Sequence, residues 1–219
     1  MGPIELDLEG LRFPPRDLDR TLPQQLAALG AGLEAVAETG PLPRETTGVF
    51  VGMEPDGEIG RWGTRWRLAR TAREKATPDG WLAKARDAVA PALEAATVVG
   101  TMPNIPANRL SSQLDLAGPG FTVQAAEASG TVALGLALRA LRAGELDAAL
   151  VGAVDLCCEP VHRSAAEALL PSGQETPGDA AVVLVLARLE DAQRQGRRIY
   201  AVFDGSAAEG PDDGDAGTC

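Results

Sequence analysis

The sequence has few of the residues used for metal or nucleophilic chemistry. Its 219 residues include one histidine and three cysteines, and Cys157 and Cys158 are adjacent. A structural zinc site needs about four such ligands at regular spacings, and this sequence contains no such spacing. An odd number of cysteines with an adjacent pair is typical of a reducing compartment and not of a disulfide framework, which predicts a cytoplasmic protein.

Basic residues and long apolar runs are also scarce. The chain has 20 Lys and Arg residues against 31 Asp and Glu residues, so its formal net charge is -11. This charge argues against binding to nucleic acid or to an anionic membrane. No apolar run reaches the roughly 20 residues that a membrane span needs, and no signal peptide opens the chain. Neither a Walker loop nor a GxGxxG loop occurs.

The remaining patterns predict one α/β domain with a largely parallel sheet. Residues 1–205 are expected to form this domain, and the glycine-rich acidic residues 206–219 a flexible tail. Helical patterns alternate with the strand patterns, and the helix over 81–96 is expected to bend or end near Pro91. The predicted strands are Gly48–Gly52, Phe121–Ala125, Ala148–Val154, Ala180–Leu189 and Ile199–Phe203. The continuous apolar run of Ala180–Leu189 predicts a buried strand.

The stretch from Gly118 to Asp155 organises the rest of the chain. A strand leads through a small-residue elbow, 127–130, into a helix over 131–143 that is apolar almost all round. That pattern predicts a central helix buried on every side. Strand-to-helix elbows are where α/β enzymes commonly place a nucleophile or bind an anion. Glu127 lies in this elbow, either as a carboxylate that caps the helix or as a general base or charged substitute for a nucleophile.

One other segment has both a structural and a functional interpretation. The segment 61–75 carries Arg61, Arg65, Arg67, Arg70, Arg73 and Lys75 against the single acid Glu74. It is either a solvated helix with Trp62 and Trp66 packed inward or a basic dock for an acidic protein or a phosphate-bearing ligand. His162 is expected to be structural or at the surface. Cys157 and Cys158 end a buried strand and are expected to act as small hydrophobic residues.

Several stretches together resemble the β-ketoacyl synthases, the thiolase-fold condensing enzymes of fatty-acid and polyketide assembly. These stretches are PPRDLDRTLPQQL, TGVFVG, NIPANRLSSQLDLAGPGFTV, GELDAALVGAVDL and GDAAVVLVLARLEDAQRQGRRIYAVFDG, in the family's order. The resemblance implies part of the N-terminal half of a thiolase-like fold, with a mixed, mostly parallel sheet. Among subfamilies, the chain looks most like the ketosynthase-like or chain-length-factor domains of polyunsaturated-fatty-acid synthases.

The chain departs from the family's pattern at the elbow and in the strands. Glu127 stands where the family's T-A-C-S-S-S motif has its acyl-accepting cysteine, and the family's two catalytic histidines lie in a half that this chain does not reach. A carboxylate cannot hold an acyl group as a thioester. The family's usual first strand is also absent. We expect that strand to lie in the middle of the sheet, so its absence should leave backbone groups unpaired there.

The resemblance implies three functional hypotheses and a set of partners. The first is a condensation-inactive domain that pairs with a cysteine-bearing ketosynthase as a dimer, through Phe121, Thr122, Val123 and Gln124, and shapes its acyl tunnel. The second is a malonyl-carrier-protein decarboxylase that uses Glu127. The third is a module that binds an acyl carrier protein through Arg61, Arg65, Arg70 and Arg73. No cofactor is expected to bind directly, because the carrier protein presents phosphopantetheine.

Overall fold

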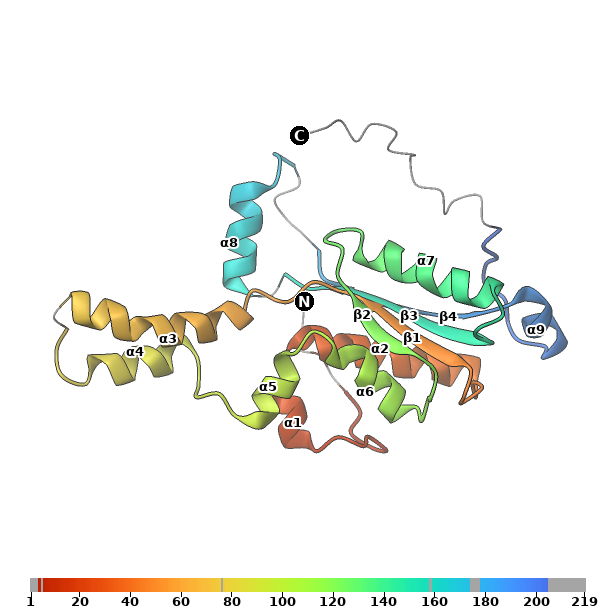
Figure 1. The fold of residues 1–219 in the computed structure, drawn as a ribbon, viewed down its shortest axis with the longest axis horizontal. Coiled ribbons are helices and arrows are strands. Elements are labelled where there is room, and N and C mark those ends of the chain that lie inside the picture. Colours follow the sequence, from red (N-terminus) through yellow and green to blue (C-terminus); the bar gives the residue numbers. More distant parts are fainter. Residues whose placement is uncertain (1–3, 5, 76, 158, 174–177, 205–219) are drawn as a thin grey trace.

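The computed structural model describes residues 4, 6–75, 77–157, 159–173 and 178–204. Its strands form one sheet in the order β2-β1-β3-β4, in which β1 pairs in parallel with β2 and β3 and β4 is antiparallel to β3 (Figure 1). This arrangement confirms the mostly parallel α/β fold. The strand bounds are Thr47–Gly52 for β1, Gly120–Val123 for β2, Ala148–Asp155 for β3 and Ala180–Ala187 for β4.

The helices begin and end close to the positions that the sequence predicts. The helix α2 starts at Pro23 and is followed by Gly40, whose φ of 86° is in the left-handed region that favours glycine. The predicted helix over 81–96 is divided by a non-helical segment at Pro91 into α4 and α5. The helix bounds are α1 Pro15–Asp19, α2 Pro23–Thr39, α3 Ile59–Glu74, α4 Trp81–Val89, α5 Ala95–Thr101, α6 Ile105–Gln113, α7 Ser129–Arg142, α8 Pro160–Leu169 and α9 Leu189–Arg194.

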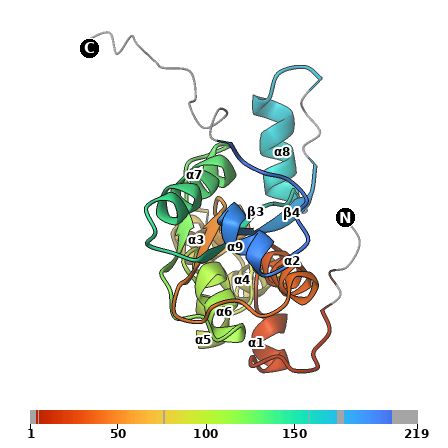
Figure 2. The same ribbon diagram turned by 90° about the vertical axis from the view of Figure 1, so that its right-hand side faces the viewer.

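Helices cover both faces of the sheet. Figures 1 and 2 show α7 on one face and α2 and α6, with α1 and α5, on the other. Alternate residues of β1 face the two helical layers. Val49 and Val51 belong to the core cluster that includes α2 and α6, and Phe50 belongs to the cluster that includes α7. All of β1 is buried, as expected for a strand with neighbours on both edges and helices on both faces.

The expectation that the central helix is buried on every side is wrong for this chain. The helix α7 buries one stripe, Ala133, Ala137 and Leu141, against the sheet, whereas Val132 on another face is exposed. Its all-round apolar composition misled the prediction because, among the described residues, the sheet is the only layer that packs on it.

Three expectations about the strands are also wrong. The sheet has no gap in its middle, because β1 and β3 pair directly through six residue pairs. The strand β4 lies at an end of the sheet and is only partly buried, although its apolar run predicts a fully buried strand. Residues Ile199–Phe203 form no strand, since no strand partner lies beside them among the described residues. The predicted tail, 206–219, lies outside the described residues.

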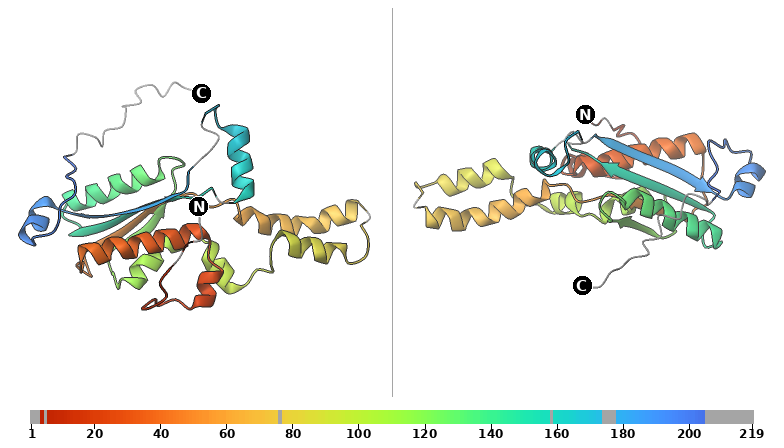
Figure 3. Two further views of the ribbon diagram at one scale, coloured as in Figure 1. Left: turned by 180° about the vertical axis from the view of Figure 1, so that it is seen from behind. Right: turned by 90° about the horizontal axis from the view of Figure 1, so that it is seen from above.

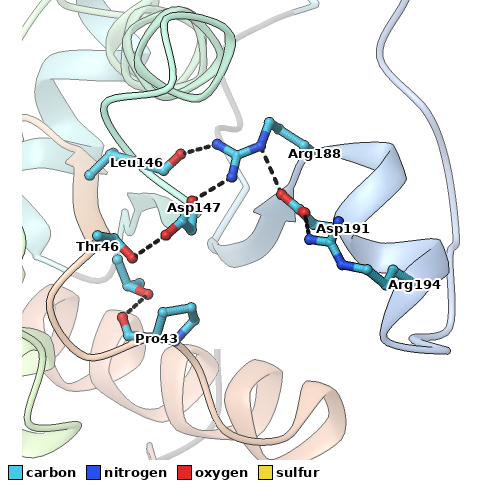
Figure 4. A network of polar contacts seen from close by, with 8 residues as sticks. Pro43, Thr46, Leu146, Asp147, Arg188, Asp191 and Arg194 are labelled. Atoms are coloured by element: carbon cyan, nitrogen blue, oxygen red, sulfur yellow. Dashed lines mark hydrogen bonds and ion pairs between the residues drawn. The ribbon is translucent and has the colours of Figure 1, made fainter.

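A polar network fastens the end of the sheet at which β1 and β3 begin and β4 ends (Figure 4). Arg188 donates to the carbonyl oxygen of Leu146 at 2.6 Å and pairs with Asp147, and Thr46 Oγ1 donates to Asp147 Oδ2 at 2.6 Å. The hydrogen bond from Thr46, followed by that from Arg188, lowers the pKa of Asp147. Arg188 also bonds Asp191 at 2.7 Å, so the network fixes α9 to the sheet.

The helices α3 and α4 form a hairpin that projects away from the sheet, which Figures 1 and 3 show from several sides. Neither helix contains a buried residue. We call this hairpin the arm. Its lack of burial means that its amino-acid sequence is not constrained by a core, which leaves its surface residues available for another role.

Candidate functional site

The candidate site lies where β1 and β2 end side by side. Gly52 of β1 is in register with Val123 of β2, and the amide of Met53 donates to the carbonyl oxygen of Val123 at 3.0 Å. The residues just beyond each strand, Glu54 on one side and the start of the turn that leads into the elbow, 125–126, on the other, are therefore neighbours. Carboxyl ends of parallel strands are where α/β folds commonly place functional groups.

The elbow has a tight and partly strained backbone. Ala126 has a φ of 49°, a left-handed conformation that costs a non-glycine residue roughly 1–2 kcal/mol. The buried Ser129 compensates: its Oγ accepts from the Ala125 amide at 2.9 Å and donates to the Ala126 carbonyl oxygen at 2.6 Å. The strand-to-helix turn predicted from the small residues is thus present, and Ser129 fixes its shape.

The elbow also requires a close approach between β1 and the start of α7. A Cβ atom on Gly52 would overlap the backbone of Ser129 and Gly130, and one on Gly130 would lie 2.8 Å from Ala153 Cβ. Glycine at these two positions therefore lets the N-terminus of α7 pack directly on the sheet. This packing places the elbow at the carboxyl ends of β1 and β2, where it is open to the surface.

Glu54 is the site residue that the sequence prediction missed. Its Oε1 accepts a hydrogen bond from the Ala126 amide at 2.8 Å and lies 3.5 Å from Ser129 Oγ. Glu54 is 72 residues from Ala126 in the chain, so no local pattern connects them. The sequence did contain one signal for it. Glu54 lies two residues after the predicted strand 48–52, and the carboxyl end of that strand lies beside the elbow.

Glu127 lies exposed at the elbow, directly before the N-cap residue of α7. It does not cap the helix, because α7 has no side-chain hydrogen bond at its N-terminus. Ser129 and Glu54 bind the turn instead, and the carboxylate of Glu127 faces solvent. A capping role, which the sequence favoured, is therefore wrong, and a chemical role for Glu127 stays a hypothesis.

The strand β2, which the sequence predicts as the dimer strand, lies at the end of the sheet opposite β4. Phe121 of β2 is 42% exposed although its ring packs edge-on against Phe50, with 5.0 Å between the ring centroids. Thr122 and Val123 are half-buried, and Gln124 is exposed. Among the described residues, β2 pairs only with β1, so its outer edge has unpaired backbone groups.

The structure separates the arginines of the arm into two kinds. Arg61 pairs with Glu159, and Arg65 donates to Asp87 at 3.0 Å and to the Ala90 carbonyl oxygen at 2.7 Å. Among the described residues, Arg70 and Arg73 have polar contacts only within α3, to Glu74 and to the Ala69 carbonyl oxygen. Arg61 and Arg65 therefore hold the arm together, whereas Arg70 and Arg73 are the more available of the four.

Arg61 joins the base of the arm to α8 through the buried carboxylate of Glu159. Burial disfavours the charged form of Glu159, but hydrogen bonds from Arg61 and from the amides of Val161 and His162 outweigh it and lower its pKa. The inward packing of both tryptophans is not observed, since Trp62 is half-buried and Trp66 is 73% exposed. An exposed tryptophan beside arginines is typical of binding surfaces.

The cysteine and histidine expectations agree with the structure where it describes them. Cys157 is 4% exposed and burial raises the pKa of its thiol, as expected for an inert small side chain. His162 is half-buried, and Cys158 lies outside the described residues. Within the described ranges, no group of three His, Cys, Asp or Glu residues could hold a metal ion, and no helix is long and apolar enough to cross a membrane.

Comparisons with known proteins agree with this fold. The family profile described as "Beta-ketoacyl synthase, N-terminal domain" matches residues 4–192. One subunit of the phenolphthiocerol/phthiocerol polyketide synthase of Mycobacterium tuberculosis is 34% identical over 92% of this chain. Component PikAIII of the pikromycin polyketide synthase of Streptomyces venezuelae is 31% identical over 93% of it. The chain therefore belongs to the β-ketoacyl synthase family, and it spans 10% and 13% of the length of these two relatives.

Solved ketosynthases share the fold. The ketosynthase of module 6 of the bacillaene synthase from Bacillus subtilis 168 matches with a TM-score of 0.60 and 25% identity, over 86% of this chain and 31% of that one. A PfaC ketosynthase–chain length factor structure matches with a TM-score of 0.67 and 22% identity, over 76% of this chain and 20% of that one. These matches confirm the thiolase-like fold that the resemblance implied.

Removing the carboxylate of Glu54 is expected to loosen the elbow. Glu54→Ala deprives the Ala126 amide of its acceptor, which should weaken local protection by roughly 1–1.5 kcal/mol, or about tenfold faster exchange of that amide. Hydrogen exchange followed by NMR measures this directly. Glu54→Gln retains an acceptor oxygen and is the matched control. Equal exchange rates at Ala126 in the wild type and in Glu54→Ala would show that Glu54 does not hold the turn.

Proposed function

We propose that this chain is part of a condensation-inactive ketosynthase-like domain that pairs with a cysteine-bearing ketosynthase and shapes its acyl tunnel. The observation that carries the proposal is Glu127, which occupies the family's cysteine position in an elbow that otherwise keeps its strand-to-helix geometry. The protein partner is thus expected to supply the thiol that this elbow lacks.

The chemistry of the elbow supports inactivity in condensation. A thiolate attacks an acyl thioester and exchanges one thioester for another, whereas a carboxylate would have to form a less stable anhydride. The Ala126 amide is also bound to Glu54 and is not available to stabilise an oxyanion. The nucleophile is therefore replaced, and one nearby hydrogen-bond donor is occupied.

Pairing is supported by the open edge of β2 and by the relatives. Phe121 presents an aromatic side chain on an unpaired strand edge, a combination that favours β-strand pairing between two chains. The curated relatives are named as a component and as a subunit of polyketide synthases, which supports a place in a larger assembly. The partner and its acyl chain remain part of the proposal.

The decarboxylase hypothesis is weaker in view of the structure. Malonate would bring its own carboxylate to an elbow that carries Glu127 and, beside it, Glu54. Like charges at close range repel, and no basic side chain contacts the elbow among the described residues.

Binding of an acyl carrier protein through the arm is a second candidate function, favoured by charge. Residues 59–89 contain eight basic and three acidic side chains, in a chain whose net charge is -11. The arm therefore offers a positive surface, with Arg70, Arg73 and the exposed Trp66, to an acidic protein. Such a partner would present phosphopantetheine without any bound cofactor in this chain.

The first prediction from the proposed function concerns acylation of the elbow. Incubated with an acyl-pantetheine thioester, the wild-type elbow is expected to acquire no acyl group, whereas Glu127→Cys gains one by thioester exchange with release of pantetheine. We expect acylation at least about fivefold faster than at Leu8→Cys, an exposed position outside the helices, because the N-terminus of α7 favours the thiolate at position 127. Peptide mapping by mass spectrometry locates the adduct. An acyl adduct on the wild-type elbow, or chain elongation by the wild type alone, contradicts the proposal.

The second prediction concerns pairing through β2. Light scattering after gel filtration is expected to show a one-to-one complex with a cysteine-bearing ketosynthase from the same source. Phe121→Asp should abolish this complex, since a carboxylate would be buried in the paired edge. Leu8→Asp changes another exposed apolar residue and should not affect it. A complex that survives Phe121→Asp would show that pairing uses a different surface.

The third prediction concerns the arm. Charge reversal in Arg70→Glu/Arg73→Glu is expected to weaken acyl-carrier-protein binding about tenfold at low salt, and less at high salt, where charges are screened. Isothermal titration calorimetry measures the affinity, with Arg20→Glu/Arg139→Glu, at two exposed positions outside the arm, as a control for net charge. An unchanged Kd in the double variant removes the arm from the binding site.

A further inference from the structure

The arm has little apolar packing to fix its orientation on the sheet. Its helices α3 and α4 contain no buried residue and pack chiefly against each other. A short helical hairpin without a core is marginally stable, so polar contacts at its root carry more weight than they would elsewhere. Arg61, in the first turn of α3, makes such a contact with Glu159, which lies outside the arm.

The carboxylate of Glu159 holds two elements at once. Its Oε1 accepts from Arg61 Nε at 2.8 Å and also from Arg61 Nη2. Its Oε2 accepts from the amides of Val161 and His162 and so caps the N-terminus of α8. Figures 1 and 3 show the start of α8 beside the start of α3. The helix α8 buries only Ala166, so it too depends on its first turn.

The closed arrangement of this junction needs the positive charge of Arg61. Glu159 is 5% exposed, and a buried charge is costly unless it is paired. Asp56 and Glu58, at the root of the arm, also interact electrostatically with Arg61. Burial, and then the charge of Asp56, raises the pKa of Glu58, and Glu159 adds to the effect. Without Arg61, the carboxylates at the root of the arm and the carboxylate under α8 would therefore repel each other.

The loop before the arm is fixed, so motion of the arm would begin after it. Gln24 Nε2 donates to the carbonyl oxygen of Glu54 at 3.3 Å. Asp56 is 2% exposed and accepts from the Glu58 amide at 2.8 Å. The contact between Glu54 and the Ala126 amide therefore lies on the fixed side of the hinge, whereas Arg61 lies on the movable side.

We propose that the pair Arg61–Glu159 is a latch that couples the arm to α8. When the pair is formed, it orients the arm and caps α8; when it is broken, both are released. Glu159 is thus a positioning residue for the arm, acting through Arg61. Because coupling between two sites is reciprocal, a protein that fixes the arm is expected to order α8. This last consequence rests on the proposed carrier-protein binding by the arm, whereas the latch itself does not.

The test uses the whole chain without a partner. All three tryptophans, Trp62, Trp66 and Trp81, lie in the arm, so time-resolved tryptophan anisotropy reports on its motion. Arg61→Gln is expected to add a component on the order of nanoseconds to the anisotropy decay. It should also accelerate amide exchange in α8 at least about tenfold, measured by hydrogen exchange and mass spectrometry. Arg65→Gln removes contacts within the arm and at its end and is the matched control, with α8 exchange unchanged.

A second substitution separates the latch from a general loss of stability. Glu159→Gln, added to Arg61→Gln, removes the unpaired buried charge and keeps an oxygen that can accept from the α8 amides. It should therefore slow α8 exchange again relative to Arg61→Gln alone, while the arm stays mobile. Exchange at Ala126 should not change in any variant, and circular dichroism verifies the fold. If Arg61→Gln does not fold, Arg61→Lys, which keeps the charge but not the two-nitrogen contact, is expected to give a smaller acceleration in α8.

Two results would overturn the proposal. The first is α8 exchange that is unchanged in the Arg61 variants, and the second is an equal acceleration of α8 exchange by Arg65→Gln. Failure of the carrier protein to bind the wild-type arm would remove the proposed partner alone, because anisotropy and α8 exchange test the latch without it.

Discussion

The fold depends on the complete burial of β1 between two parallel neighbours. Its six residues pair with β3 throughout and with β2 over their last four positions, and side chains alternate between the two helical layers. Every side of β1 is thus occupied by another element, which limits the size of its side chains. At position 52 only glycine fits, because α7 begins against the strand there. The same pairing brings the residues after β1 next to the elbow after β2. The contact between Glu54 and Ala126 is a direct consequence.

The sequence was sufficient to predict what depends on local patterns, and it failed where neighbours decide. The strand at 48–52, the helix after Pro23 and the elbow at 127–130 could be predicted because propensity, turn residues and apolar periodicity agree there. The apolar runs of β4 and α7 were misinterpreted as fully buried, because an apolar run does not reveal which of its sides another element covers. Glu54 was missed for a similar reason, since only the parallel pairing of β1 and β2 brings it to Ala126.

The two ends of the sheet differ in a way that bears on assembly. At β2, the open edge carries an aromatic residue beside the elbow, so pairing there would bring a partner close to Glu127. At β4, the open edge lies in a groove away from the elbow, with the Arg188 network at one end. A partner at β2 would therefore lie near the elbow, whereas the β4 edge is remote from it.

Under the proposed function, the elbow keeps the shape of a strand-to-helix turn without a reactive thiol. The left-handed Ala126, the buried Ser129 and the close approach at Gly52 preserve the shape that exposes the residue at position 127. A neutral thiol at this position could ionise near the start of α7 and react. A carboxylate at the same position is exposed to solvent and would have to form a less stable anhydride to hold the acyl group. Because the strained turn costs free energy without supplying a nucleophile, its retention fits a role in shaping a shared acyl site.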